Sequence, residues 1–269
     1  MPDKNAAFVG EIPENYDRYL GPVLFEPYAA DLVARLDVPE GGAVLELACG
    51  TGIVTQHLLE RRAPGARIVA TDLNEAMLAF ARNKLANDEI VEWRQADAAE
   101  LPFPDQSFDA VVCQFGVMFF PDKEKAAREA YRVLKPEGAF LFNVWDAIEH
   151  NDLPHIAHAI ITKFFDDNPP DFYQIPFCFH DAETIRSLLT AAGFRQIQLS
   201  RAPLIAIAPS AGEVAKGLVH GNPVITAIRE RDQASIPKIE AAVAEAVARQ
   251  CGAAPVRARM QALICVAVR

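Results

Sequence analysis

The chain has 269 residues, of which 51% are hydrophobic and 23% charged, so it is a folded globular protein of one domain, not a disordered chain. A formal net charge of −10 argues against nucleic acid as a partner, because such binding depends on clustered lysine and arginine. The 5 cysteines are far apart and include no CxxC pair, which argues against a disulfide framework or a zinc site.

The N-terminal sequence lacks the charged and then apolar pattern of a signal peptide. No apolar run in the chain approaches the length of a membrane span. We therefore expect a cytoplasmic protein without stable insertion into a membrane.

From residue 42 to residue 145, short β-branched runs alternate with longer helical stretches, which is typical of a parallel sheet covered by helices. The predicted strands are 43–48, 67–71, 90–94, 108–113 and 138–145, and the predicted helices are 52–62, 74–86 and 122–134. Connections in such a sheet are right-handed, so we expect the carboxyl ends of the strands to share one edge.

After Trp145 the pattern changes. It predicts a helix over 150–168, an aromatic and proline-rich segment up to Phe179, a helix over 181–191, a strand over 195–207, a helical block over 210–251 and a last strand over 257–268. Two late strands, the last antiparallel, would complete a seven-stranded sheet, which makes the 210–251 block an insertion. The aromatic rings of the proline-rich segment are expected to form an apolar lid, or alternatively the core of the insertion itself.

A glycine turn follows the first predicted strand, within Val44-Leu45-Glu46-Leu47-Ala48-Cys49-Gly50-Thr51-Gly52. Gly50 and Gly52 can adopt backbone angles closed to other residues and let a ligand lie against the main chain. The helix that begins there presents unpaired N–H groups to that ligand. A dinucleotide-binding turn uses the same geometry, but its third glycine would fall at Thr55.

Acidic residues follow the strands at this edge. Asp72, at the end of the second strand, can accept both ribose hydroxyls of an adenosine ligand; the alternative is that it caps the next helix, a role that Asn74 could fill equally well. Asp97 can accept the adenine amino group, with Leu73 and Met77 on the faces of the ring, or can be an ordinary capping or loop residue. Glu46 offers negative charge where a sulfonium and an α-ammonium would lie.

Several motifs in order resemble those of class I S-adenosylmethionine-dependent methyltransferases, in particular the group similar to ubiquinone/menaquinone-biosynthesis C-methyltransferases. They are Val44 to Gly52, Thr71-Asp72-Leu73-Asn74 with Met77-Leu78, Gln95-Ala96-Asp97-Ala98 with Leu101-Pro102-Phe103, Phe108 to Gly116, and Arg132-Val133-Leu134-Lys135-Pro136-Glu137-Gly138. The resemblance covers about residues 40–145. Ala48 departs from it, because many members have a glycine there.

The resemblance implies a Rossmann-like α/β fold with a seven-stranded sheet of order 3-2-1-4-5-7-6. It also implies S-adenosyl-L-methionine as cofactor, with S-adenosyl-L-homocysteine as product. The residues expected to bind this cofactor are Arg18, Tyr19, Glu46, Ala48, Gly50, Gly52, Asp72, Leu73, Met77, Asp97, Ala98 and Gln114. Arg18 and Tyr19 belong to a segment, Tyr16 to Pro22, that looks like the N-terminal element covering the cofactor; a surface arginine beside Asp17 is the alternative for Arg18.

The expected organisation is a single methyltransferase domain over 1–269. Within it, residues 1–40 form an N-terminal helical cover, 41–146 the cofactor-binding core, and 147–180 and 208–252 the insertions that form a lid over the substrate.

Methyl transfer from a sulfonium requires alignment and exclusion of water more than acid–base groups, so no catalytic triad is expected, and no triad motif occurs. Asp146, His150, Tyr173 and His180 are candidates for a general base, and none can be assigned as catalytic. His150, His155 and His158 have helical spacing typical of a solvent-facing surface, so we expect no metal.

The expected partner is a small-molecule methyl acceptor, aromatic or lipid-like, while a homodimer is left open. Two other functions stay in consideration: an NAD-type oxidoreductase and a non-catalytic protein that binds S-adenosylmethionine.

Overall fold

The structure is a computed structural model that describes residues 8–86 and 90–269. Contacts divide the chain into two compact units, which are described separately. The sheet unit comprises Tyr28–Trp145, Phe179–Ala202 and Ala262–Arg269, and the helical unit comprises Met1–Pro27, Asp146–Cys178 and Pro203–Gln261.

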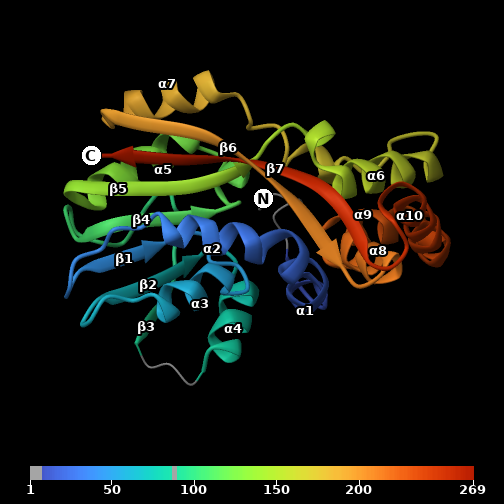
Figure 1. Cartoon of the computed structure of the whole chain (residues 1–269), viewed down its shortest axis with the longest axis horizontal. Coiled ribbons are helices and arrows are strands. Elements are labelled where there is room, and N and C mark those ends of the chain that lie inside the picture. Colours follow the sequence, from blue (N-terminus) through green and yellow to red (C-terminus); the bar gives the residue numbers. More distant parts are fainter. Residues whose placement is uncertain (1–7, 87–89) are drawn as a thin grey trace. The chain divides into compact units, whose positions relative to one another are not determined.

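The seven strands form one sheet in the order β3-β2-β1-β4-β5-β7-β6, which confirms the predicted fold class (Figure 1). The strands are β1 (Ala43–Glu46), β2 (Arg67–Asp72), β3 (Val91–Gln95), β4 (Phe108–Gln114), β5 (Leu134–Trp145), β6 (Gln196–Ala208) and β7 (Val256–Val268). β1 to β5 pair in parallel, whereas β7 is antiparallel to β5, as predicted for the last strand.

The register brings the carboxyl ends of the first four strands together. Glu46 of β1 is opposite Val112 of β4, and Asp72 of β2 is opposite Gln95 of β3. All four residues of β1 are buried, because a central parallel strand is covered on both faces. The edge where these strands end therefore lies at the end of a fully buried central strand.

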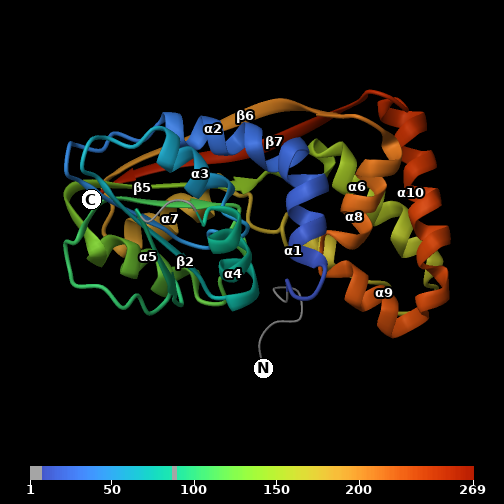
Figure 2. The same cartoon turned by 90° about the horizontal axis from the view of Figure 1, so that it is seen from below.

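Helices cover both faces of this sheet. They are α2 (Glu26–Ala34), α3 (Ile53–Glu60), α4 (Glu75–Lys84), α5 (Lys123–Val133) and α7 (Ala182–Ala192). Figures 1 and 2 show α2 and α3 on one face of the sheet, with α5 and α7 on the other. Asp122 and Asp181 cap α5 and α7 through their carboxylates, and Gly193 ends α7 with a φ of +112°.

The helical unit has a core of its own. Its longer elements are α1 (Ile12–Asn15), the π-helical segment η2 (Tyr16–Phe25), α6 (Asp152–Ile161), α8 (Ala211–His220), α9 (Val224–Asp232) and α10 (Ile236–Cys251). α10 packs on α6 and α8, and α8 packs on η2. Gly217 permits the last contact, since a Cβ there would lie 2.8 Å from the Leu20 side chain.

Short 3₁₀ turns connect several of these elements. They are η3 (Val117–Phe119), η4 (Ile148–His150), η5 (Thr162–Phe164), η6 (Phe172–Gln174) and η7 (Gln233–Ser235). The helix predicted over 150–168 was too long, because α6 ends at Ile161 and Asn168 has a φ of +55° just before two prolines.

The aromatic rings of Phe172 and Tyr173, in η6, are packed within the helical unit. Phe172 and Tyr173 are buried, and the Tyr173 hydroxyl donates a 2.6 Å hydrogen bond to the carbonyl of Leu218 in α8. The burial and the hydrogen bond of Tyr173 agree with the alternative in which these rings form the core of the insertion itself.

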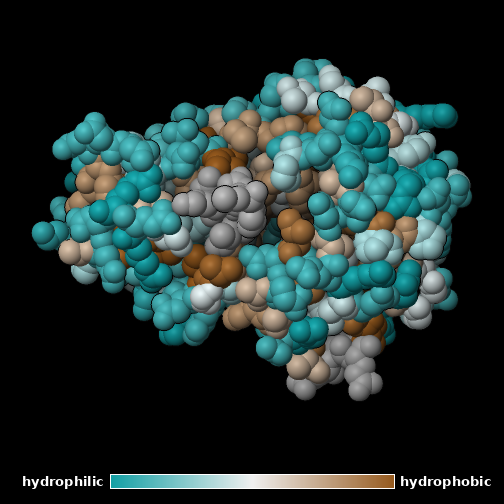
Figure 3. Space-filling model, turned by 180° about the vertical axis from the view of Figure 1, so that it is seen from behind, coloured by the Kyte–Doolittle hydropathy of each residue, from teal (hydrophilic) through white to brown (hydrophobic). Residues whose placement is uncertain are grey.

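Hydrophilic side chains cover most of the face seen in Figure 3, and apolar side chains gather there in smaller patches. Within residues 8–86 and 90–269, no helix combines the length and apolar character needed to cross a membrane. The same residues contain no group of three or more acidic, cysteine or histidine side chains placed to hold a metal ion.

Candidate functional site

The glycine turn after β1 has an unusual backbone. Ala48, Gly50 and Gly52 have φ values of +52°, +56° and +78°, in the left-handed region. The turn is held to the neighbouring strand because the N–H of Cys49 donates to the Thr71 carbonyl at 2.9 Å. A Cβ at Gly50 would meet only the Met77 methyl group, at 3.8 Å, so the main chain at Gly50 is open to close approach by a ligand.

Gly52 is required for a different reason. A Cβ at this position would lie 3.1 Å from the Cβ of Ala81 in α4, so glycine allows the start of α3 to pack closely on α4. The N–H of Gly52 donates to the Cys49 carbonyl at 2.9 Å and closes the turn.

Asp72 connects this turn to the start of α4. Its Oδ2 accepts a hydrogen bond from the N–H of Gly50 and its Oδ1 accepts one from the N–H of Asn74, both at 2.8 Å. The side chain that caps α4 is that of Asn74, which accepts from Ala76 and Met77, so the alternative role of Asp72 as this cap is wrong. Burial raises the pKa of Asp72, against the lowering effect of its backbone hydrogen bonds.

Glu46 is the other buried acid of this edge, with an exposed fraction of 2%. Its Oε2 accepts a 2.6 Å hydrogen bond from the Thr55 hydroxyl on α3. Burial, opposed by this hydrogen bond and reinforced by the nearby charge of Asp72, raises the pKa of Glu46 to about 8. Among the described residues, no lysine, arginine or histidine forms an ion pair with Glu46 or Asp72.

Thr51 lies between the two glycines and was not selected from the sequence. Its exposed fraction is 1%, and its Oγ1 is the buried side-chain oxygen that lacks a hydrogen-bond partner within the described part of the chain. A buried hydroxyl without a partner is costly, by about 1–3 kcal/mol. This oxygen belongs to the residue that follows Gly50, whose main chain is open.

The ends of β2 and β3 place an apolar and an acidic side chain at the surface. Leu73 has an exposed fraction of 60% and directly follows the last residue of β2. The Gln95 amide donates to the Leu73 carbonyl at 2.9 Å and fixes the main chain there. Asp97 is exposed after β3, and Ala98 beside it is buried.

Gln114, at the end of β4, is held by a residue that sequence reasoning missed. Asn143 of β5 is completely buried; its Oδ1 accepts from the N–H of Phe115 at 3.0 Å, and its Nδ2 lies 3.4 Å from the Gln114 Oε1. Phe115 has a φ of +47° and stacks on Trp145, with ring centroids 3.8 Å apart. An isolated polar residue within an apolar strand was the available signal for Asn143.

Ten of the predicted site residues therefore belong to the sheet unit; nine of them lie where β1, β2, β3 and β4 end or in the turns that follow, and Met77 lies in the first turn of α4. They are Glu46, Ala48, Gly50, Gly52, Asp72, Leu73, Met77, Asp97, Ala98 and Gln114. Arg18 and Tyr19 belong to η2 of the helical unit. There the Arg18 guanidinium and the Lys216 ammonium lie 5.2 and 5.1 Å from the centre of the Tyr19 ring.

The candidate bases are distributed over both units. Asp146 is buried, with Oδ2 accepting from the Gln261 amide at 2.6 Å and Oδ1 from the N–H of Ala147 at 2.8 Å. Tyr173 is engaged with Leu218, His150 is exposed, and His180 belongs to the sheet unit. Asp146 and Tyr173 thus make structural hydrogen bonds. These bonds would be disturbed if either side chain accepted a proton from a substrate.

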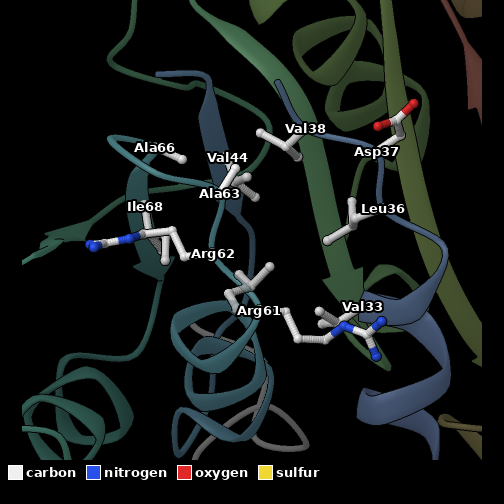
Figure 4. A pocket seen from close by; sticks show the side chains of 11 residues that line it. Val33, Leu36, Asp37, Val38, Val44, Arg61, Arg62, Ala63, Ala66 and Ile68 are labelled. Carbon is white, nitrogen blue, oxygen red and sulfur yellow. The ribbon is translucent and has the colours of Figure 1, made fainter. Parts of the chain in front are cut away.

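A pocket of about 210 Å³ lies at the opposite end of the sheet, where β1 and β2 begin. Its walls are mainly aliphatic, and Figure 4 shows the guanidinium groups of Arg61 and Arg62 pointing to opposite sides. A ligand site needs a few polar groups that converge on one position, and typical ligand pockets exceed 300 Å³. This pocket therefore lacks the chemistry found at the carboxyl edge.

Comparison with known proteins agrees with this geometry. The family model described as a methyltransferase domain matches residues 45–142. The chain is 36% identical over 179 residues to the ubiquinone/menaquinone biosynthesis C-methyltransferase UbiE of Idiomarina loihiensis, and 34% identical over 179 residues to UbiE of Escherichia coli; each match covers 60% of this chain and 69% of the other protein.

Solved structures share the fold at lower identity. A phosphoethanolamine N-methyltransferase 2 of Haemonchus contortus, in complex with S-adenosyl-L-methionine, has a TM-score of 0.63 and 16% identity, covering 98% of this chain and 58% of that one. The YcgJ protein of Bacillus subtilis has a TM-score of 0.58 and 19% identity, covering 90% of this chain and 98% of that one. With the motifs, the strand order and the UbiE relatives, these matches show that the chain belongs to the class I S-adenosylmethionine-dependent methyltransferases, in the family of the UbiE C-methyltransferases.

Proposed function

We propose that the carboxyl edge of the sheet unit binds S-adenosyl-L-methionine and that the protein transfers its methyl group to a small-molecule acceptor. The observation that carries this proposal is the pair of buried carboxylates, Glu46 and Asp72, which have no cationic side chain as partner within the described residues. A ligand with positive charge and hydroxyl donors would satisfy both groups.

Asp72 and Asp97 would hold the nucleoside part. The Asp72 carboxylate, fixed by two backbone N–H groups, has acceptor capacity left for the two ribose hydroxyls. Leu73 presents an exposed apolar surface to one face of the adenine ring, and Asp97 accepts from its amino group. The backbone just before Asp97 is linked to Asp72, since the N–H of Ala96 donates to the Asp72 carbonyl at 3.1 Å.

The glycine turn would hold the methionine part of the cofactor. The main chain at Gly50 is open, and the Thr51 hydroxyl lacks a partner that the cofactor can supply. Ionised Glu46 stabilises the positive charge of the amino acid part. The open main chain at Gly50, the Thr51 hydroxyl and the Glu46 carboxylate at the end of β1 therefore fit this cofactor.

When bound, S-adenosyl-L-methionine supplies an electrophilic methyl group on a positively charged sulfur. The residues of this chain then bind and orient the cofactor and exclude water, so that the acceptor approaches the methyl carbon in line with the breaking bond. Orientation of this kind is worth about 7–11 kcal/mol in favourable cases. We assign no general base.

The acceptor is proposed to be an aromatic or lipid-like small molecule. The names of the UbiE relatives, which place them in ubiquinone and menaquinone biosynthesis, support an acceptor of this chemistry. The insertions 147–180 and 208–252 are proposed as the lid that selects it. The relatives match 60% of the chain, so the acceptor is assigned by class alone.

Calorimetric titration of the purified chain tests the cofactor. We expect S-adenosyl-L-methionine and S-adenosyl-L-homocysteine to bind at one site and NAD to show no binding, because the turn lacks the third glycine of the dinucleotide motif. Binding of NAD alone would refute the proposal. A screen of aromatic and lipid-like acceptors with labelled methyl donor then tests transfer; failure across the panel, with the cofactor bound, would favour a non-catalytic binding protein.

A further inference from the structure

The loop between β3 and β4 carries Asp97 and makes a tight turn directly after it. The Asp97 Oδ1 accepts from the N–H of Ala99 at 2.8 Å, and the Asp97 carbonyl accepts from the N–H of Glu100 at 2.9 Å. The direction of the Asp97 carboxylate is therefore tied to the position of this turn.

Leu101, the next residue, is anchored to helix α5 by both of its backbone polar groups. Its N–H donates to Glu129 Oε2 at 2.8 Å, and its carbonyl accepts from Arg132 Nη2 at 3.0 Å. The Leu101 side chain is buried, so the anchor has both polar and apolar parts. Glu129 and Arg132 thus hold the downstream end of the turn that orients Asp97.

Arg132 uses each of its five guanidinium N–H groups in this anchor. Nε donates to Glu129 Oε1 at 2.7 Å, and Nη2 donates to Glu129 Oε2 at 2.8 Å as well as to Leu101. Nη1 donates to the Phe103 carbonyl and to Asp105 Oδ1, both at 2.8 Å. Lysine has three donors on one atom and lacks the planar fork, so it cannot reproduce this set.

The neighbouring arginine on the same helix provides a contrast. Arg128, one turn earlier, makes an exposed ion pair with Glu124 at 3.6 Å. Hydrogen bonds from Arg132 lower the pKa of Glu129, so the Glu129–Arg132 pair stays charged at neutral pH.

We propose that Glu129 and Arg132 are positioning residues for recognition of the adenine base, which they achieve by holding Leu101 and thereby the Asp97 turn; this rests on the proposed function. The pair fixes the distance from the Asp97 carboxylate to the position of the adenine amino group. Loss of the pair would loosen this carboxylate while leaving Asp72 and the glycine turn in place.

A purely structural anchor would behave differently from a positioning anchor. General loosening of the sheet unit would weaken all ligands by one factor, whereas displacement of Asp97 would specifically weaken ligands that carry the adenine amino group. The preference for S-adenosyl-L-homocysteine over its deaminated analogue, in which hypoxanthine replaces adenine, separates the two effects.

The experiment measures both dissociation constants by calorimetry for the full chain and three variants, well below their unfolding temperatures. We expect the unmodified chain to prefer adenine by about tenfold, the worth of one good hydrogen bond. Arg132→Gln and Arg132→Lys should reduce this preference to about twofold, because neither side chain can make the forked contacts. The control, Arg128→Gln, should leave both constants unchanged.

Glu129→Gln serves as a fourth variant if the Arg132 variants fail to fold, and should reduce the preference by about threefold, since an amide has one acceptor oxygen instead of two. An unchanged preference in the Arg132 and Glu129 variants, with or without a general loss of affinity, would overturn the inference. If the unmodified chain binds neither compound, the proposed function itself fails, so the two failures are distinguishable.

Discussion

At the two ends of the same sheet, the pKa values of buried or partly buried acidic side chains are shifted in opposite directions. At the amino end of β4, Asp109 Oδ2 accepts from Lys135 Nζ at 2.8 Å and from the N–H of Ala43 at 2.7 Å. Partial burial opposes ionisation there, but these hydrogen bonds lower the pKa of Asp109 overall. At the carboxyl end of β1, burial dominates and raises the pKa of Glu46 to about 8.

This difference shows how to separate stabilising charges from charges kept for a ligand. The protein itself neutralises Asp109, so this residue contributes to folding. Glu46 and Asp72 are buried without such a partner among the described residues, so they cost stability until a ligand completes their surroundings. Substitutions at the two ends should therefore have opposite consequences for folding and for binding.

The largest effect is expected for Asp72→Asn. An amide places a donor where two ribose hydroxyls and two backbone N–H groups need an acceptor, and the loss of about 3 kcal/mol would weaken cofactor binding by roughly 150-fold. The measurement is calorimetric titration with S-adenosyl-L-homocysteine.

The matched control at the amino end is Asp109→Asn. It should leave the dissociation constant unchanged and lower the free energy of unfolding by about 1 kcal/mol, since the Lys135 partner is partly exposed. This contribution is present above the ordinary pKa of aspartate and is lost as the pH falls through the lowered pKa. Equal losses of affinity in both variants would break the distinction between the two ends.

A smaller effect is expected from the pH dependence of Glu46. A cationic cofactor requires the ionised carboxylate, so with a pKa of about 8 its affinity should rise from pH 6 to pH 8 by about 50-fold, and a proton should be released on binding. Calorimetry in two buffers with different ionisation enthalpies measures that proton directly. Glu46→Gln should remove the pH dependence, and a pH dependence that survives the substitution would assign it to another group.

The same group affects folding in the reverse direction. Since its pKa rises from 4.5 to about 8 on folding, the stabilising contribution of the protonated carboxyl is complete below pH 4.5 and is lost as the pH rises through 8. The free protein with Glu46→Gln should therefore gain stability relative to the unmodified chain at pH 9.

The smallest effect is expected for Thr51→Val, which replaces a buried hydroxyl without a partner by a methyl group of similar size. The free protein should become more stable by about 1 kcal/mol, while cofactor affinity falls by about threefold to tenfold. Thermal unfolding without and with S-adenosyl-L-homocysteine measures both quantities. A loss of stability in the free protein would show that Thr51 has a protein partner.

The strands of the core and the glycine turn could be predicted because their signals are local: the alternation of strands and helices, and the succession of Val44 to Gly52 and Asp72. The order of the strands in the sheet is not a local signal, and its prediction rested on the resemblance of the motifs to the methyltransferase family. Cofactor contacts of the individual residues stay predictions. The partners of Asn143 and the five bonds of Arg132 were not predictable, because they depend on pairing between β4 and β5 and on a loop about thirty positions away. The α6 boundary was missed because apolar periodicity continued beyond Ile161.

The turns that follow β1 and β4 lie so close together that the space between Ala48 and Gly116 holds a single methyl group, that of Ala48. A Cβ at Gly116 would lie 2.7 Å both from the Cβ of Ala48, which already occupies the left-handed region at a φ of +52°, and from the Cys113 Sγ. Alanine is therefore tolerated in the turn only while position 116 stays glycine. A homologous sequence with a side chain at position 116 would have to displace both the Cys113 side chain and the turn after β1, so glycine at 116 reports whether a relative retains this spacing.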